Sequence, residues 1–166
     1  MRVVGIDPGL SYTGFGIVDS DEKGRLRHIS SGAIKTSSRL PFVERLSKIH
    51  LELEGIFQQF NPQHMAIEEV FFARNVRTAL LLGQARGVAL LSASLAGIPV
   101  FEYSATALKM AVCRYGRADK EQVGAMVKVL LQIDQKMSSH ASDALAACIC
   151  HSHNMQTYQA RGTHST

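Results

Sequence analysis

Short apolar runs separated by polar turns open the chain and predict three consecutive strands. Val3 to Ile6 form the first run and Phe15 to Val18 the second, with Pro8 and Gly9 in the connection between them. Residues 26–36 form a third apolar-rich run after the polar turn DSDEKGR. Consecutive strands joined by short turns favour an antiparallel meander.

After Pro41 the apolar spacing becomes helical. Phe42 to Phe60 carry apolar residues at the positions that line one helix face, and the dipeptide NP at 61–62 ends the pattern. The rest of the chain alternates short strands with helices. Strands are predicted over 64–70 and 99–103, and helices over 76–96, 105–114, 120–132 and 140–154, with Ser104, Asp119 and Ser139 as caps of the last three.

This order predicts an α/β fold. Three strands, a helix, and then strands alternating with helices imply a mixed five-stranded sheet with helices on both faces, which is the ribonuclease-H-like order. A chain of 166 residues is most simply one domain, which we place over 1–155. Residues 156–166 have no apolar period, and we expect them to form a mobile polar tail.

Composition and charge narrow the class of protein. The chain is 46% hydrophobic and 19% charged, as globular proteins are. We see no signal leader and no apolar run near the ~18 residues of a membrane span, so we expect no membrane partner. Three cysteines form no disulfide framework and suit a reducing cytoplasm.

Positive charge is concentrated in the middle third. Residues 74–128 hold eight Lys or Arg against three Asp or Glu, a net charge of +5, whereas residues 1–73 have a net charge of −1. Such a region indicates a polyanionic partner, and a solvated basic face is the alternative. Arg74 begins this region, and we expect it to contact DNA.

Acidic residues lie at the ends of predicted elements, where a core does not need them. Asp7 ends the first strand, Glu68 and Glu69 end the fourth, and Asp143 lies near the start of the last helix, one turn after His140. If the first and fourth strands are neighbours, these carboxylates converge at one edge of the sheet. Converging carboxylates need a cation, and Mg²⁺ or Mn²⁺ suits oxygen ligands. The alternative is that Asp7 stabilises a turn and Asp143 a helix start.

Five stretches together carry a family resemblance. They are GIDPGLSYTGFGIV, MAIEEVFFARN, LGQARGVAL, PVFEYSATALKMAV and HASDALA, and in this order and spacing the chain resembles the RuvC-type Holliday-junction resolvases. The resemblance covers nearly all of the chain except the tail. It implies that Asp7, Glu68, His140 and Asp143 are the catalytic, metal-binding set, with two Mg²⁺ or Mn²⁺ ions in each site.

His140 departs from the family pattern, because the best-known members carry aspartate there. Imidazole binds Mg²⁺ poorly but is acceptable to Mn²⁺, and neutral histidine can accept a proton from water. His140 is therefore expected either to ligate one metal or to activate the nucleophilic water. The alternative is a histidine that simply rests at a helix start.

The resemblance also implies DNA contacts outside the acidic set. Phe71 matches an aromatic that wedges into the junction, and Lys109 and Lys120 match basic positions near the scissile phosphate. A core phenylalanine and two surface lysines are the alternatives that the residues alone leave open.

The implied activity is metal-dependent cleavage of four-way DNA junctions in recombination and repair. Members of the family act as homodimers, make paired symmetric nicks that leave 5′-phosphates, prefer a short sequence containing TT, and cooperate with a branch-migration motor. The predicted helix over 76–96 is apolar on more than one face, which fits a partner subunit. A helix enclosed within the monomer is the alternative.

Two other functions and one other site are alternatives. A non-catalytic junction-binding protein would not need the intact carboxylates, and a relative of the actin-like ATPases would need two domains and a longer chain. The stretch CICHSH at 148–153 has metal-ligand residues. Residues two apart on a helix point away from each other, so core cysteines and helix-end histidines are the better interpretation.

Overall fold

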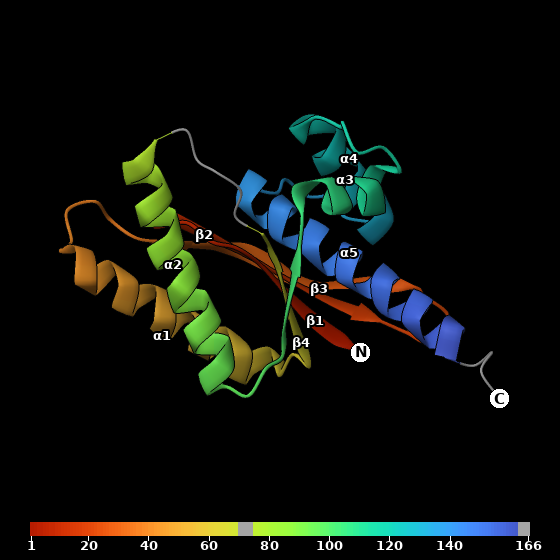
Figure 1. Ribbon diagram of the computed structural model, residues 1–166, viewed down its shortest axis with the longest axis horizontal. Coiled ribbons are helices and arrows are strands. Elements are labelled where there is room, and N and C mark those ends of the chain that lie inside the picture. Colours follow the sequence, from red (N-terminus) through yellow and green to blue (C-terminus); the bar gives the residue numbers. More distant parts are fainter. Residues whose placement is uncertain (70–74, 163–166) are drawn as a thin grey trace.

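A five-stranded mixed sheet forms the centre of the computed structural model, which describes residues 1–69 and 75–162 (Figure 1). The strand order is β3-β2-β1-β4-β5. The first three strands are antiparallel neighbours, and β4 and β5 run parallel to β1. The strands are β1 (Arg2–Asp7), β2 (Tyr12–Ser20), β3 (Leu26–Lys35), β4 (His64–Glu68) and β5 (Val100–Tyr103). The predicted ribonuclease-H-like fold class is confirmed.

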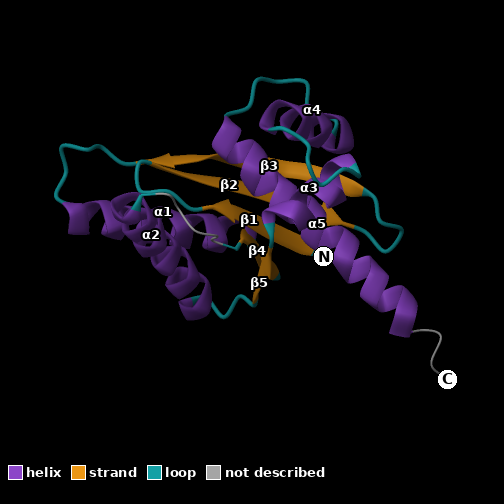
Figure 2. Cartoon of the chain, turned by 45° about the horizontal axis from the view of Figure 1, so that its top comes forward, coloured by secondary structure: helices purple, strands orange, loops and turns teal. Residues whose placement is uncertain are grey.

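Helices cover both faces of this sheet (Figure 2). Two of them pack on one face and three on the other, and each face has its own hydrophobic core. The first face carries α1 (Phe42–Phe60) and α2 (Val76–Leu95), and the second carries α3 (Ala105–Cys113), α4 (Lys120–Leu131) and α5 (Ser139–Gly162). Side-chain caps at Ser104 and Asp119 are present as predicted, and Asp119 forms a capping box with Gln122.

Strand alternation sends successive side chains of β1 to opposite faces. Val4 and Ile6 enter the core under α1 and α2, whereas Val3 enters the core under α5. Gly5 lies against α5 as well. Asp7 therefore falls on the α5 face, although its chain neighbour Ile6 is buried on the other side. The same two-residue period decides which residues of each strand face the last helix.

Two glycines allow the backbone of α5 to lie directly on the sheet. A Cβ atom on Gly5 would be 1.9 Å from the backbone oxygen of Ala144, and one on Gly14 would be 2.1 Å from that of His140. Both atoms belong to the helix backbone, which cannot rotate away as a side chain can. These two positions need glycine for the close approach, and the approach brings the first turns of α5 to the ends of β1 and β2.

The last helix differs from the prediction at both ends. Ser138 Oγ, and not Ser139, accepts a hydrogen bond from the first turn, at the backbone N–H of Ala141. The helix continues to Gly162, past the predicted end at 154, and Gln156 donates to Ser20 Oγ. The apolar spacing predicts no helix beyond 154, whereas in the structure Gln156 lies within the longer helix and contacts β2. The mobility of the tail over 156–166 and the domain limits stay predictions.

Several large apolar side chains of α2 face outward. Its fully buried residues are small, and Leu81, Val88 and Leu90 are partly buried against the core, but four large residues are exposed: Val76 (76%), Leu80 (61%), Leu91 (57%) and Leu95 (70%). The alternative of a helix enclosed within the monomer is therefore wrong. By length and composition α2 is also apolar enough to span a membrane, so the expectation that no described segment reaches that limit is wrong. Arg77 and Arg86 interrupt the apolar sequence of α2, but its mean hydropathy remains that of an apolar helix.

A methyl group at Gly5 should separate α5 from the sheet. We expect Gly5→Ala to lower the free energy of unfolding by at least about 2–3 kcal/mol, because backbone rather than side chain must move. The matched control is Gly55→Ala on α1, where a Cβ meets nothing within 4 Å. That change should raise stability by about 0.5–1 kcal/mol. Urea unfolding of both variants measures the difference, and equal stabilities would contradict the close approach.

Candidate active site

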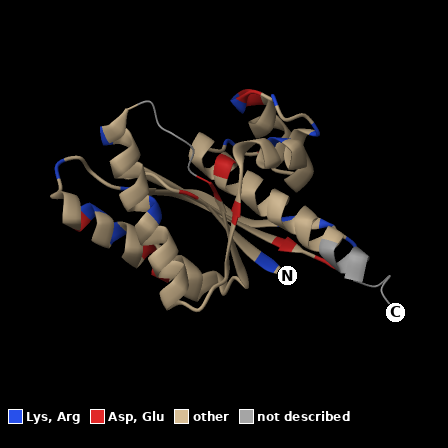
Figure 3. Ribbon diagram, in the orientation of Figure 1, with Lys and Arg blue, Asp and Glu red and all other residues tan. Residues whose placement is uncertain are grey.

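The carboxyl ends of β1 and β4 lie side by side and position two of the predicted acids. The strands are parallel, with Ile6 opposite Ile67, so Asp7 and Glu68 follow at the same edge of the sheet. The first turns of α5 add His140 and Asp143 to this edge, where ribbon segments coloured for Asp and Glu lie near one another (Figure 3). The structure thus brings together the four residues that the sequence analysis singled out.

His140 and Asp7 contact each other directly. Nδ1 of His140 lies 2.8 Å from Oδ2 of Asp7, across 133 positions of sequence. Both side chains are partly exposed, at 38% for His140 and 26% for Asp7, so this is a wet site at the surface and not a closed core pair. The close contact of Gly14 with the His140 backbone sets this distance.

Basic side chains meet the acidic cluster from α3 and α4. Lys120 Nζ lies 2.7 Å from Oδ2 of Asp143. Lys109 lines a cavity of about 250 Å³ together with Glu68, Lys120 and Asp143. Both predicted lysines are therefore beside the carboxylates. A pocket with this mixture of charges can hold an anionic group such as a phosphate next to a cation.

Burial and mutual repulsion act together on the carboxylates. Burial raises the pKa of Asp7, the hydrogen bond with His140 lowers it, and repulsion from Asp143 raises it again. The pKa of Glu68 is raised by burial and then by the charges of Asp7 and Asp143, against the two lysines. The hydrogen bond with Asp143 raises the pKa of the Lys120 ammonium. Added positive charge would stabilise the ionised acids.

Glu68 rather than its neighbour Glu69 faces this cluster. Glu68 is the last residue of β4, on the same face as the buried Ala66, and it feels the charges of Asp7 and Asp143. The alternation of a strand directs the next side chain to the other face. The backbone N–H of Glu69 instead continues the sheet by donating to the carbonyl of Tyr103. The choice between the two acids thus has a geometric basis.

The donor set fits a hard divalent cation. Three carboxylates and an imidazole lie at one edge, and burial, followed by repulsion from neighbouring carboxylates, raises the pKa values of Asp7 and Glu68. As the side chains stand, no three His, Cys, Asp or Glu residues in the described ranges are placed to share an ion. Asp143 is engaged by Lys120 and Asp7 by His140. An ion would therefore be held through carboxylate oxygens that these contacts do not use, such as Oδ1 of Asp7, and as Asp143 turns from Lys120.

Phe71 and Arg74 fall outside the described residues, so their roles stay predictions. Sequence reasoning missed Tyr12, whose ring stacks on that of His140 at a centroid distance of 5.4 Å. A tyrosine at the start of a strand gives no sequence signal of this contact, because position 140 reaches it only through the tertiary fold.

The cysteines of the CICHSH stretch lie where we expected, but its histidines do not. Cys148 and Cys150 are buried, in agreement with core cysteines. Because α5 continues to Gly162, neither His151 nor His153 is at a helix end, so that expectation is wrong, and His151 is fully buried. Its ring contacts His64 Nδ1 at 2.8 Å and the Tyr103 hydroxyl at 2.7 Å, and burial lowers its pKa to about 4.

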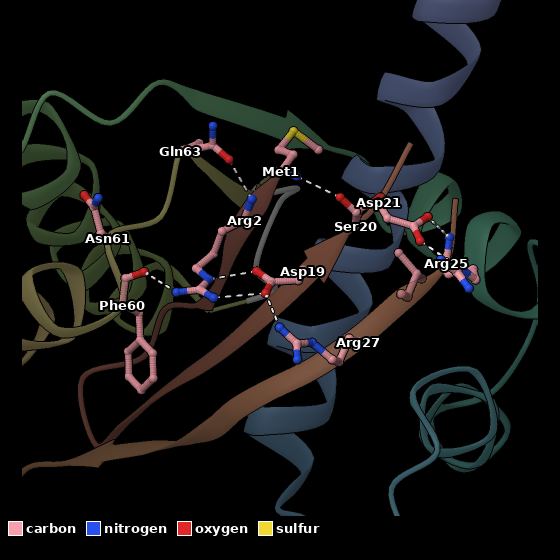
Figure 4. A pocket seen from close by; sticks show the side chains of 11 residues that line it. Met1, Arg2, Asp19, Ser20, Asp21, Arg25, Arg27, Phe60, Asn61 and Gln63 are labelled. Atoms are coloured by element: carbon pink, nitrogen blue, oxygen red, sulfur yellow. Dashed lines mark hydrogen bonds and ion pairs between the residues drawn. The ribbon is translucent and has the colours of Figure 1, made fainter. Parts of the chain in front are cut away.

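A larger cavity, of about 830 Å³, lies at the opposite end of β1 and is not the candidate site (Figure 4). Its charged side chains already satisfy one another across paired strands. Arg2 binds Asp19 through two hydrogen bonds, and Arg27 binds the same carboxylate at 3.0 Å. These residues are direct neighbours in the sheet register, which explains them as cross-strand pairs. The volume of a cavity therefore does not by itself identify the candidate active site.

Comparison with known proteins gives one consistent family. The family described as Crossover junction endodeoxyribonuclease RuvC matches residues 3–151. The RuvC protein of Citrifermentans bemidjiense is 48% identical over 154 residues, which is 93% of each chain. The structure of Thermus thermophilus RuvC superposes with a TM-score of 0.87 at 35% identity, covering 95% of this chain and 97% of that one.

A second Thermus thermophilus structure holds RuvC in complex with a Holliday junction substrate. It superposes with a TM-score of 0.90 at 34% identity, covering 95% of this chain and 96% of that one. Sequence and structure thus agree over nearly the full length of both proteins. The chain belongs to the RuvC family of crossover junction endodeoxyribonucleases.

Proposed function

We propose that the chain resolves four-way DNA junctions by metal-assisted hydrolysis at the edge formed by Asp7, Glu68, His140 and Asp143. The observation that carries the proposal is the convergence of these four side chains, with Lys109 and Lys120 beside them, in a member of the RuvC family. The junction-bound relative from Thermus thermophilus supports four-way DNA as the substrate. A nicking assay on a synthetic junction, with and without divalent metal, tests it directly.

The carboxylates would hold the metal, and Mg²⁺ or Mn²⁺ is the class of ion that they favour. Two ions in each site is our proposal. When bound, such ions stabilise the charge that develops on the attacking and leaving oxygens of a phosphodiester. Asp7, Glu68 and Asp143 supply the hard oxygen ligands. His140 supplies either a fourth ligand or the base that removes a proton from the attacking water.

The lysines would hold the phosphate and balance charge. Lys120 neutralises Asp143 in the structure, so its ammonium lies where an incoming phosphate would meet the carboxylates. As the phosphate arrives, Lys120 can exchange one anion for another. Lys109 lines the same cavity from α3. Its positive charge opposes the rise in the pKa of Glu68 and so favours the charged carboxylate.

We propose a homodimer formed through α2. Large apolar side chains are exposed along this helix, and a two-fold symmetric junction needs two sites for paired nicks. A branch-migration motor as a further partner, 5′-phosphate products and a cytoplasmic location are proposals of the same kind. The cysteines agree with a reducing compartment, since Cys113, Cys148 and Cys150 are all unpaired.

Removing one carboxylate charge should stop cleavage and spare DNA binding. We expect Asp7→Asn and Glu68→Gln each to lower the single-turnover nicking rate at least about 100-fold, because charge stabilisation by metal is worth several kcal/mol. Junction affinity should be unchanged or tighter, since a negative charge beside phosphate is lost. The control is Glu69→Gln, which leaves the cluster intact. Rapid cleavage by Asp7→Asn in a folded protein would contradict the metal site.

Removing a phosphate-binding lysine should weaken both cleavage and the salt dependence of binding. We expect Lys109→Ala and Lys120→Ala each to reduce the slope of log Kd against log salt by about one unit, because one fewer counterion is released. Lys48→Ala, on the exposed side of α1, is the control and should keep the wild-type slope. Unchanged slopes and rates in both variants would assign the two lysines to the solvated surface.

Charge on α2 should separate the subunits. We expect Leu80→Lys or Leu91→Lys to give a monomer in sedimentation experiments at concentrations where the wild type is dimeric, because an apolar interface excludes an unpaired ammonium. Leu51→Lys on α1 is the matched control, since Leu51 is equally exposed at 62%. None of these positions is buried, so the fold should survive. A dimer that persists in both α2 variants would place the interface elsewhere.

A further inference from the structure

The ring of His140 is held on its face by an aromatic side chain that the proposed chemistry does not use. Tyr12 begins β2, and its ring lies nearly parallel to the imidazole, at 9° and 5.4 Å between centroids. Tyr12 is 41% exposed, so burial in a core does not explain a large aromatic here. Offset stacking at this distance is a favourable geometry for two rings.

Lys35 holds the tyrosine in turn. It is the direct cross-strand partner of Tyr12 in the register of β2 and β3, so their side chains lie on the same face of the sheet. Its ammonium lies over the tyrosine ring, 5.7 Å from the centroid, which is within the range of a cation–π contact. Lys35, Tyr12, His140 and Asp7 thus form one continuous chain of contacts.

These contacts restrain the imidazole in three ways. Gly14 lies against the backbone of His140, Tyr12 lies on the face of its ring, and Asp7 binds Nδ1 in the ring plane. An imidazole without the stacking contact could turn about its terminal torsion, which is soft, and carry Nδ1 away from the carboxylate, so that the carboxylate would no longer select the tautomer. With the ring fixed, an ionised Asp7 accepts a hydrogen bond from Nδ1–H, and the lone pair of the neutral ring is on Nε2.

We propose that Tyr12, supported by Lys35, is a positioning residue that fixes the ring plane and tautomer of His140. Nε2 is then the nitrogen that ligates metal or accepts the proton of water. This inference rests on the proposed function, since it assigns a role within the same site. It also pairs two positions, because a carboxylate at position 140 would offer no ring for Tyr12 to stack on.

A double-mutant cycle tests the pairing through activity. In the wild-type background we expect Tyr12→Leu to lower the single-turnover nicking rate about three- to tenfold, the factor that one aromatic contact corresponds to, with junction Kd unchanged. Tyr12→Phe keeps the ring and should restore most of the rate. In a His140→Asp background, Tyr12→Leu should cause no further loss. Equal losses in both backgrounds would overturn the proposal. A weakened junction Kd would also overturn it and would make Tyr12 a DNA contact.

A nitrogen NMR measurement on the metal-free protein tests the tautomer without relying on activity. We expect ¹⁵N shifts of the neutral His140 ring to show one Nδ1–H tautomer in the wild type and in Tyr12→Phe. Tyr12→Leu should give a mixture of tautomers, and Lys35→Met a smaller change in the same direction. A single unchanged tautomer in Tyr12→Leu would overturn the proposal.

The two measurements also separate this inference from the proposed function. If the wild type bound metal but cleaved no junction, the proposed function would fail, while the tautomer shifts would still decide the role of Tyr12. If the wild type cleaved normally and Tyr12→Leu changed neither rate nor tautomer, only the role of Tyr12 would fail.

Discussion

The direct contact between the backbone of α5 and the first two strands is the constraint on which the site depends. Helices usually rest on a sheet through their side chains, but here Gly5 and Gly14 leave no Cβ between the two backbones. The helix therefore lies low enough for His140 to reach Asp7 at 2.8 Å. If side chains separated the backbone of α5 from the sheet, His140 and Asp7 would lie too far apart to contact each other.

Electrostatics explains why this edge of the sheet suits a cation. The fold places Asp7, Glu68 and Asp143 close enough for their charges to repel, and burial raises the pKa of the first two. His140 and Lys120 partly relieve this repulsion. Lys120 could exchange Asp143 for a substrate phosphate, and Oδ1 of Asp7, which His140 does not contact, could bind a metal ion. The resting structure is thus stable while its carboxylates remain available to a cation.

Other charged and polar clusters of the chain are satisfied internally, which distinguishes them from the site. Asp19 is bound by arginines on both neighbouring strands, and they lower the pKa of its carboxyl. His151 is fully buried among aromatic rings and is kept neutral by a lowered pKa. Each of these groups already has its hydrogen-bonding partners. Beside the first turns of α5, in contrast, the three carboxylates of Asp7, Glu68 and Asp143 share two direct contacts, one with His140 and one with Lys120.

The sequence by itself determined the elements and the acidic set. Apolar periodicity predicted every strand and helix, because local spacing reflects which face is buried, and the matched motifs gave the family. The resemblance selected Glu68, and alternation along β4 agrees that only one of Glu68 and Glu69 can face the cluster. Tertiary structure decided what depends on distant segments: the true length of α5, the burial of His151, the exposure of α2 and the stacking of Tyr12 on His140. None of these follows from local pattern, since each is set by how closely one element approaches another, and that distance is fixed only when the whole core packs.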